Sequence, residues 1–174
     1  SLHDALPISS RPSHFKGVTS VVSKLFNIIM PDVAFFGQKD AQQVAVIEKM
    51  VRELNFDIAI KACPIVRESD GLAMSSRNSY LNSEERQAAL VLSQALGHAK
   101  KRIESGVTST QTLIDDMRQI IESSPFATID YVQIVDSRTL EGIDVLSDDF
   151  LVALAVKIGK TRLIDNFRQR RATL

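Results

Sequence analysis

The sequence predicts an α/β protein built from two unlike parts. In the first 80 residues, apolar patterns of helical and strand type alternate, an order that favours a parallel sheet with a crossover helix. Beyond residue 80, two helical patterns precede three consecutive strand-like runs, which is typical of a small α+β unit. This change of pattern places a domain boundary near residue 80.

The first part opens with an aperiodic stretch and then becomes helical. Residues 1–10 show no clear period, and residues 11–17, RPSHFKG, indicate a proline-containing turn. From Val18 to Ile29, apolar residues recur at helical spacing on one face, and Pro31 ends the pattern. An amphipathic helix is therefore expected here.

Two apolar runs flank a second helical pattern. The runs 32–37 (DVAFFG) and 56–66 (FDIAIKACPIV) are short and dense in apolar residues, which predicts two buried strands. Residues 38–55 between them have helical spacing, with Asp40 as the expected N-cap and Asn55 just past the end. A strand, a helix and a second strand in this order predict a parallel pair.

A two-stranded parallel sheet is incomplete by itself. It cannot bury both of its faces, and both of its edges offer unpaired backbone groups. The first part therefore suggests a larger sheet whose beginning is missing from this sequence.

The second part begins with helices and ends with strands. Residues 82–106 have helical spacing, start with a capping-box pattern of Asn82 and Glu85, and end at Gly106. A second helix is expected over residues 110–123. Three strand-like runs follow, namely TIDYVQIVD (128–136), FLVALAVKIG (150–159) and TRLIDN (161–166).

Composition argues against several classes of function. Lys plus Arg and Asp plus Glu each number 21, so the formal net charge is zero and no basic surplus indicates a nucleic-acid partner. The longest apolar runs are far shorter than the ~20 residues of a membrane-spanning helix, so no membrane association is expected. Cys63 is the single cysteine; its apolar run predicts a small buried side chain, and a reducing cytoplasm is the expected location.

The segment FFGQKD lies at a strand-to-helix junction, where ligands of open α/β sheets bind. Gly37 allows backbone to approach a ligand, Lys39 supplies a cation, and the free N–H groups of the next helix favour an anion. Asp40 can cap that helix or receive a ribose hydroxyl, and Gln42 and Gln43 can hydrogen-bond a polar substrate. The alternative is a surface loop with a solvated lysine.

The segment DGLAMSSRNSYL, residues 70–81, is the second candidate. Ser75 and Ser76 offer hydroxyl donors, and Arg77 offers a fork of donors that matches phosphate oxygens. The alternative is a polar turn with the arginine lying over the following helix. Because this segment also follows a strand, both candidate loops are expected to face one crevice and to hold a nucleotide.

A third cluster is basic and lies near the start of the first helix. Arg11, His14 and Lys16 gather there, and His14 can touch an anionic substrate, although a single histidine in a turn is more often structural. His3 and His98 are expected to be uninvolved. No group of histidines or carboxylates has the spacing of metal ligands.

Several strings of this sequence resemble the pantothenate synthetase (pantoate–β-alanine ligase) family. They are RPSHFKGV, SKLFNIIMPDVAFFGQKDAQQ, DGLAMSSRNSYL and RLIDN, in this order from about Arg11 to about Asn166. The resemblance implies a Rossmann-like nucleotidyltransferase sheet of the HIGH/KMSKS superfamily, followed by a small α+β lid domain. It also implies a two-step reaction, in which ATP and pantoate form pantoyl adenylate and β-alanine then displaces AMP, with Mg²⁺ assisting the phosphates.

The resemblance assigns roles to individual positions. It makes GQKD the ATP-binding loop, in which Lys39 neutralises phosphate charge and Asp40 meets the ribose, and it makes MSSR the family's form of the KMSKS loop, with Arg77 holding charge on the departing pyrophosphate. Gln43 resembles a pantoate-binding glutamine, and Arg11 and His14 lie in a segment that borders the pantoate pocket in the family. The residues implied at the ATP site are Gly37, Gln38, Lys39, Asp40, Val66 (through its backbone, to adenine), Met74, Ser75, Ser76 and Arg77, of which Lys39, Ser75, Ser76 and Arg77 are the implied catalytic residues.

One family motif has no counterpart in this sequence. The HIGH-type motif, with its proton-donor histidine, precedes RPxHF in the family, so the chain is expected to be a carboxyl-terminal fragment that is poorly active alone. Residues 1–10 are expected to be a foreign junction, residues 11–80 the end of the nucleotide-binding domain, and residues 81–174 the lid. The family implies a homodimer. The alternatives are a non-catalytic ATP-binding remnant and another member of the nucleotidyltransferase superfamily.

Overall fold

A computed structural model describes residues 12–169 of the 174-residue chain, with side chains described from residue 15 onwards. The chain forms two compact units, of which the first ends at Pro64 and the second begins at Ile65. Residues 65–80 therefore pack with the second unit, although the sequence places them with the first. The domain boundary near residue 80 stays a prediction about family organisation.

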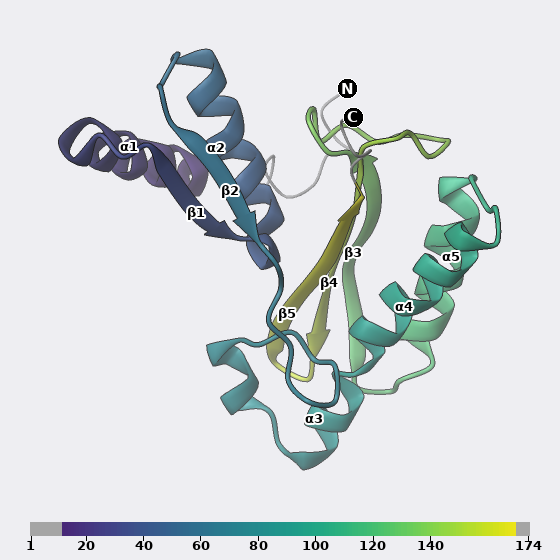
Figure 1. Cartoon of the computed structure of the whole chain (residues 1–174). Helices are drawn as coiled ribbons and strands as arrows, with labels where there is room; N and C mark the ends of the chain where they lie inside the picture. The colour runs from purple at the N-terminus through teal and green to yellow at the C-terminus, as the bar shows by residue number, and fades with distance from the viewer. Residues whose placement is uncertain (1–11, 170–174) are drawn as a thin grey trace. The chain divides into compact units, whose positions relative to one another are not determined.

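The first unit contains the expected helix, strand, helix and strand. Its two strands are parallel neighbours, with Val33 opposite Ala59 and Gly37 opposite Cys63, which confirms the predicted crossover arrangement (Figure 1). The elements are α1 (Pro12–Ile29), β1 (Val33–Gly37), the 3-10 helix η2 (Gln38–Asp40), α2 (Ala41–Glu53) and β2 (Ala59–Cys63).

Helix α1 begins earlier than the sequence pattern predicts. It starts at Pro12, so most of the segment expected to form a turn is helical. The prediction was wrong because proline, which breaks a helix interior, suits the first helical position, where its missing N–H has no intrahelical partner.

The core of the first unit is small and lies on one face of its sheet. Phe26 of α1 packs with Ile47 and Met50 of α2, and alternate residues of the two strands lie against them. These strand residues are Ala34 and Phe36 in β1 and Ile60 in β2, with Ile58 just before β2.

The other face of this sheet is exposed, which corrects two predictions. Strand β2 is largely exposed and β1 only half-buried, so neither is the buried strand that the apolar runs predict. Phe35 is 65% exposed, and Cys63, two positions beyond Lys61 on the uncovered face, is exposed rather than buried. The physical reason is that two helices cover only one side of the strand pair.

The second unit is an antiparallel sheet with helices on one face. Its strand order is β3–β4–β5, and β4 is the central strand (Figure 1). Helices α4 and α5 pack on this sheet and on each other, and their contact face supplies much of the core. The elements are η3 (Ser76–Tyr80), α3 (Ser83–Ala88), α4 (Val91–Glu104), α5 (Thr110–Glu122), β3 (Ala127–Asp136), β4 (Phe150–Ile158) and β5 (Thr161–Gln169).

The long helix expected over residues 82–106 is divided in two. Its predicted capping box is confirmed, because Asn82 accepts from the Glu85 N–H at 2.9 Å and Glu85 accepts from the Asn82 N–H at 3.0 Å. The helix is interrupted at Ala89 and Leu90, where the Leu90 N–H donates to the Gln87 carbonyl, a tighter 3-10 bond. No glycine or proline marks this break, so the pattern alone does not reveal it.

Candidate functional site

The first candidate loop begins where β1 ends. Gly37 has extended backbone, with φ −71° and ψ 126°, so its conformation does not itself demand glycine. A Cβ atom built on Gly37 would meet nothing within 4 Å among the described residues. No described residue therefore blocks the approach of a ligand to this backbone, and the binding role of Gly37 stays a prediction.

The start of α2 follows directly. Asp40 occupies the N-cap position, as predicted, but its side chain makes no capping hydrogen bond, and it is exposed. The Asp40 carboxylate therefore does not accept a hydrogen bond from the first N–H groups of α2. The partial positive charge at this end of the helix remains available to an anion.

Three further side chains surround this helix start. Lys39 and Gln43 are half-buried, which limits the directions that their polar ends can take. The Gln42 side-chain nitrogen is buried and has no hydrogen-bond partner among the described residues. A buried amide donor without a partner is costly, so this position suits a polar ligand or neighbour.

The second candidate loop starts as a narrow antiparallel turn. Arg67 and Ala73 form a β-bridge, and the Met74 N–H donates to the Val66 carbonyl at 2.9 Å. Gly71 lies at the bend with φ +94°, a left-handed conformation that favours glycine. Val66 is 66% exposed, and because its carbonyl oxygen has two lone pairs it can accept a second hydrogen bond besides that from Met74.

The serines and arginine occupy the turn that follows. The Ser75 hydroxyl oxygen accepts from the Arg77 N–H at 3.2 Å and thereby caps η3. Ser76 and Arg77 are exposed, and the Arg77 guanidinium makes no ion pair with any described residue. This stretch is thus a polar turn, as one interpretation expected. It also presents a cation that has no counter-charge among residues 12–169, which the phosphate interpretation requires.

Sequence reasoning missed the side chains that hold this loop. Arg67 donates to both carboxylate oxygens of Asp165 in β5, at 2.7 and 2.9 Å, and to the Gly71 carbonyl at 3.0 Å. Arg86 of α3 lies 2.7 Å from Asp70. The RLIDN string contains Asp165, but Asp165 and Arg67 are 98 residues apart, so no local sequence pattern predicts that they pair.

One carboxylate of the loop has a perturbed acidity. The hydrogen bond from Arg86 lowers the pKa of Asp70 below its usual value, and the Leu72 N–H, which donates to Asp70 at 3.2 Å, acts in the same direction. Both donors favour the charged carboxylate. The bend of the loop is therefore held by an ionised aspartate at neutral pH.

The structure brings the predicted site residues together in two separate groups, one in each unit. His14 falls in the first turn of α1, and its side chain, like the whole of Arg11, lies outside the described residues. His98 lies 3.6 Å from Asp116 of α5, and its expected lack of involvement stays a prediction. Gly37, Gln38, Lys39, Asp40 and Gln43 belong to the first unit, and Val66, Met74, Ser75, Ser76 and Arg77 to the second.

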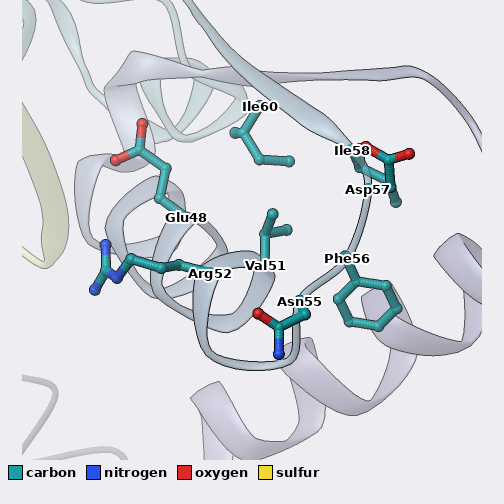
Figure 2. Close-up of a pocket in the computed structure, with 8 residues that line it drawn as sticks. All are labelled: Glu48, Val51, Arg52, Asn55, Phe56, Asp57, Ile58 and Ile60. Atoms are coloured by element: carbon teal, nitrogen blue, oxygen red, sulfur yellow. The ribbon is translucent and has the colours of Figure 1, made fainter.

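A hollow of about 520 Å³ lies elsewhere on the first unit. Figure 2 shows its lining from the last turns of α2 and the chain that leads into β2. It contains none of the predicted site residues, and its apolar lining residues Val51, Phe56, Ile58 and Ile60 pack against the small core of this unit. We therefore assign no ligand to it.

The described residues do not provide a metal site of their own. No group of three or more His, Cys, Asp or Glu among them is arranged to hold a metal ion. The expected Mg²⁺ stays a prediction, and no step below is routed through it. Within residues 12–169, no helix is long and apolar enough to cross a membrane.

The fold defines a class of protein. Solved pantothenate synthetases have a similar fold: that of Thermus thermophilus matches 93% of this chain and 58% of its own with a TM-score of 0.86 and 37% identity. The pantoate-beta-alanine ligase of Francisella tularensis, solved in complex with beta-gamma ATP and beta-alanine, matches 93% of this chain and 53% of its own with a TM-score of 0.63 and 31% identity.

The chain belongs to the pantoate-beta-alanine ligase family, whose family model matches residues 1–168. The pantothenate synthetase of Ruminiclostridium cellulolyticum is 54% identical over 158 residues, covering 91% of this chain and 56% of the relative. That of Heliobacterium modesticaldum is 56% identical over 165 residues, covering 95% and 59%. The chain thus spans little more than half the length of the curated relatives it matches. The matched region includes residues 1–10, whose expected foreign origin stays a prediction.

Proposed function

We propose that this chain carries part of the site for ATP-dependent ligation of pantoate and β-alanine to pantothenate, through a pantoyl-adenylate intermediate. Membership of the family is the observation that carries the proposal. The Francisella tularensis relative, which was solved with beta-gamma ATP and beta-alanine, supports ATP and β-alanine as substrates.

In the first step, a pantoate carboxylate oxygen attacks the α-phosphorus of ATP, and the bond to pyrophosphate breaks. The nucleophile is already charged, so no proton must be removed. In the second step, the β-alanine amine attacks the acyl carbon, AMP leaves and the amine loses a proton. Alignment of the reactants and stabilisation of phosphate charge therefore supply most of the rate.

Arg77 is assigned to the departing pyrophosphate. Its guanidinium is exposed and makes no ion pair with the described residues, so its fork of donors can meet two phosphate oxygens at once. Ser76 is exposed beside it and adds a hydroxyl donor, whereas Ser75 mainly shapes the turn through its bond to the Arg77 N–H. Met74 and the Val66 backbone, at the base of the turn, are assigned to adenine.

The loop of the first unit is assigned to the rest of the substrates. Lys39 neutralises phosphate charge next to the start of α2, whose N–H groups favour the same anion. The exposed Asp40 carboxylate, which is not engaged in capping, accepts from a ribose hydroxyl. Gly37 leaves room for ATP, Gln38 borders it, and Gln43 donates to pantoate.

Calorimetric titration with ATP tests the binding half of the proposal. Lys39→Ala and Arg77→Ala are each expected to weaken ATP binding about tenfold or more, the scale of one lost hydrogen bond to a charged group. Lys49→Ala, on the exposed side of the same helix α2, and Arg118→Ala, on α5, are matched controls that should leave binding unchanged. Equal affinity in all four variants would contradict the assignment.

A coupled assay of AMP release from ATP, pantoate and β-alanine tests the catalytic half. The 174-residue chain alone is expected to turn over poorly, because the HIGH-type histidine motif has no counterpart in its sequence. The alternative, a non-catalytic binding module, predicts ATP binding with no AMP release at all, so slow release that depends on both pantoate and β-alanine would exclude it. AMP release at the rate of a full-length relative would contradict the expected low activity. A homodimer and a cytoplasmic location stay predictions from the family.

A further inference from the structure

We infer that Asp165 and Arg67 form a positioning pair that holds the phosphate loop, residues 66–77, in its binding conformation. The inference deepens the proposed function and rests on it, since it assumes that Arg77 in this loop meets ATP. Neither residue is expected to touch a substrate. The pair gives a role to the RLIDN string, which the resemblance left without one.

Asp165 is an unusual residue for its place in β5. It lies opposite Leu154 of the central strand, so its side chain shares the face that carries Leu163 and Phe167. It is 2% exposed, and a carboxylate so deeply buried is costly unless it is paired and hydrogen-bonded. A packing role alone would be served better by an apolar side chain.

Arg67 satisfies this carboxylate in the most specific way available. Its two terminal nitrogens donate to the two carboxylate oxygens, at 2.7 and 2.9 Å, and the Asn166 N–H donates a third bond at 2.8 Å. The planar fork permits one relative orientation of the two side chains. The position of Arg67 is therefore fixed relative to β5.

The same guanidinium fixes the bend of the loop. It donates to the Gly71 carbonyl at 3.0 Å, and Arg67 forms the β-bridge with Ala73. Two residues beyond Ala73 is Ser75, whose hydroxyl accepts from the Arg77 N–H. A short chain of backbone and side-chain contacts thus leads from the buried Asp165 to the exposed Arg77.

The test separates positioning from stability with a paired substitution. Replacing both members of a buried ion pair by apolar residues of similar size often preserves stability, so the double variant Arg67→Met/Asp165→Leu is expected to fold. ATP affinity should fall about tenfold, the lower end of what losing a group that orients a ligating residue costs. Amide exchange of Gly71, Leu72 and Met74 should accelerate. Asp130→Asn is the matched control, because it removes the 2.8 Å pair between Asp130 of β3 and Arg162, which lies on β5 like Asp165; it should change neither readout.

A double-mutant cycle gives the readout that a purely structural role would not move. If the pair acts through the loop, adding Arg67→Met/Asp165→Leu to Arg77→Ala should cause little further loss of ATP affinity. Wild-type affinity in the folded paired variant, or a loss that adds fully to that of Arg77→Ala, would overturn the inference.

Failure of the proposed function has a different signature. If the wild-type chain binds no ATP, the nucleotide assignment falls, and amide exchange alone decides the structural claim. Faster exchange confined to residues 71–78 of the paired variant would still support the anchoring role. Unchanged exchange there would overturn it. Should the paired variant fail to fold, Arg67→Lys, which keeps the charge but loses the fork, is measured instead and read by the same two criteria.

Discussion

Gly159, in the turn between β4 and β5, lies directly against the carboxylate of Glu85 at the start of α3. A Cβ atom built on Gly159 would collide with Glu85 Oε1, and the φ of Gly159 is +56°. Glu85 is also half of the capping box with Asn82. The turn of the β4–β5 hairpin and the first turn of the helix that follows the phosphate loop are therefore fitted to each other.

This relationship predicts that Gly159→Ala is destabilising. The left-handed conformation alone costs a residue with a Cβ atom of order 1–3 kcal/mol, and displacement of Glu85 would weaken the capping box as well. Gly97→Ala in α4 is the matched control: nothing described lies within 4 Å of its added Cβ, so replacing a helical glycine should stabilise by about 0.5–1 kcal/mol. Urea unfolding followed by far-ultraviolet circular dichroism measures both, and a shift of the same sign in the two variants would contradict the prediction.

The two units should differ in local stability. Strand β4 is central and nearly all of its side chains are buried, whereas β1 and β2 form a pair with one exposed face. Amide exchange should therefore be slowest in residues 151–156 and much faster in residues 59–63. Comparable protection in β2 and β4, measured under native conditions, would show that the small core around Ile47 stabilises its unit more than the packing indicates.

Two valines of the second unit offer a matched test of its core. Val156 in β4 is fully buried, and Val145 is 62% exposed. Val156→Ala should lower the free energy of unfolding by about 2 kcal/mol through lost burial and a residual cavity. Val145→Ala should change it by no more than about 0.5 kcal/mol. If denaturant unfolding shows equal effects, the burial of the central strand is not what stabilises this unit.

The phosphate loop should loosen in acid because of Asp70. Its pKa is lowered in the folded state, chiefly by Arg86, so the charged carboxylate stabilises the fold above its unfolded-state pKa of about 3.9. That contribution is lost as the pH falls through the lowered folded-state pKa. Asp70→Asn should therefore reduce the difference in stability between pH 6 and pH 3, as measured by thermal unfolding. Identical pH profiles for wild type and Asp70→Asn would show that the Arg86 pair does not act in solution.

Local patterns were sufficient for most of the elements. Helical and strand periodicities predict α2, α5 and the three strands of the second unit to within a few residues, because each has a continuous apolar face and a local start or stop signal. The capping box at Asn82 is a signal of this kind and is confirmed. Pro12 misled the same reasoning, since a proline marks either a turn or a helix start and only the following residues decide which.

Burial and the support of the site were decided by tertiary structure. The run containing Cys63 is as apolar as a core strand, yet only one face of the sheet it joins is covered, so Cys63 is exposed. Likewise, the residue types of MSSR indicate phosphate chemistry from sequence, but the partner that holds this loop, Asp165, is 98 residues from Arg67. Sequence by itself determined the family, the elements and the chemical character of the two loops, because these depend on near neighbours in the chain. Which faces are covered and which charges are paired depend on contacts between distant residues, and only the folded structure specifies those.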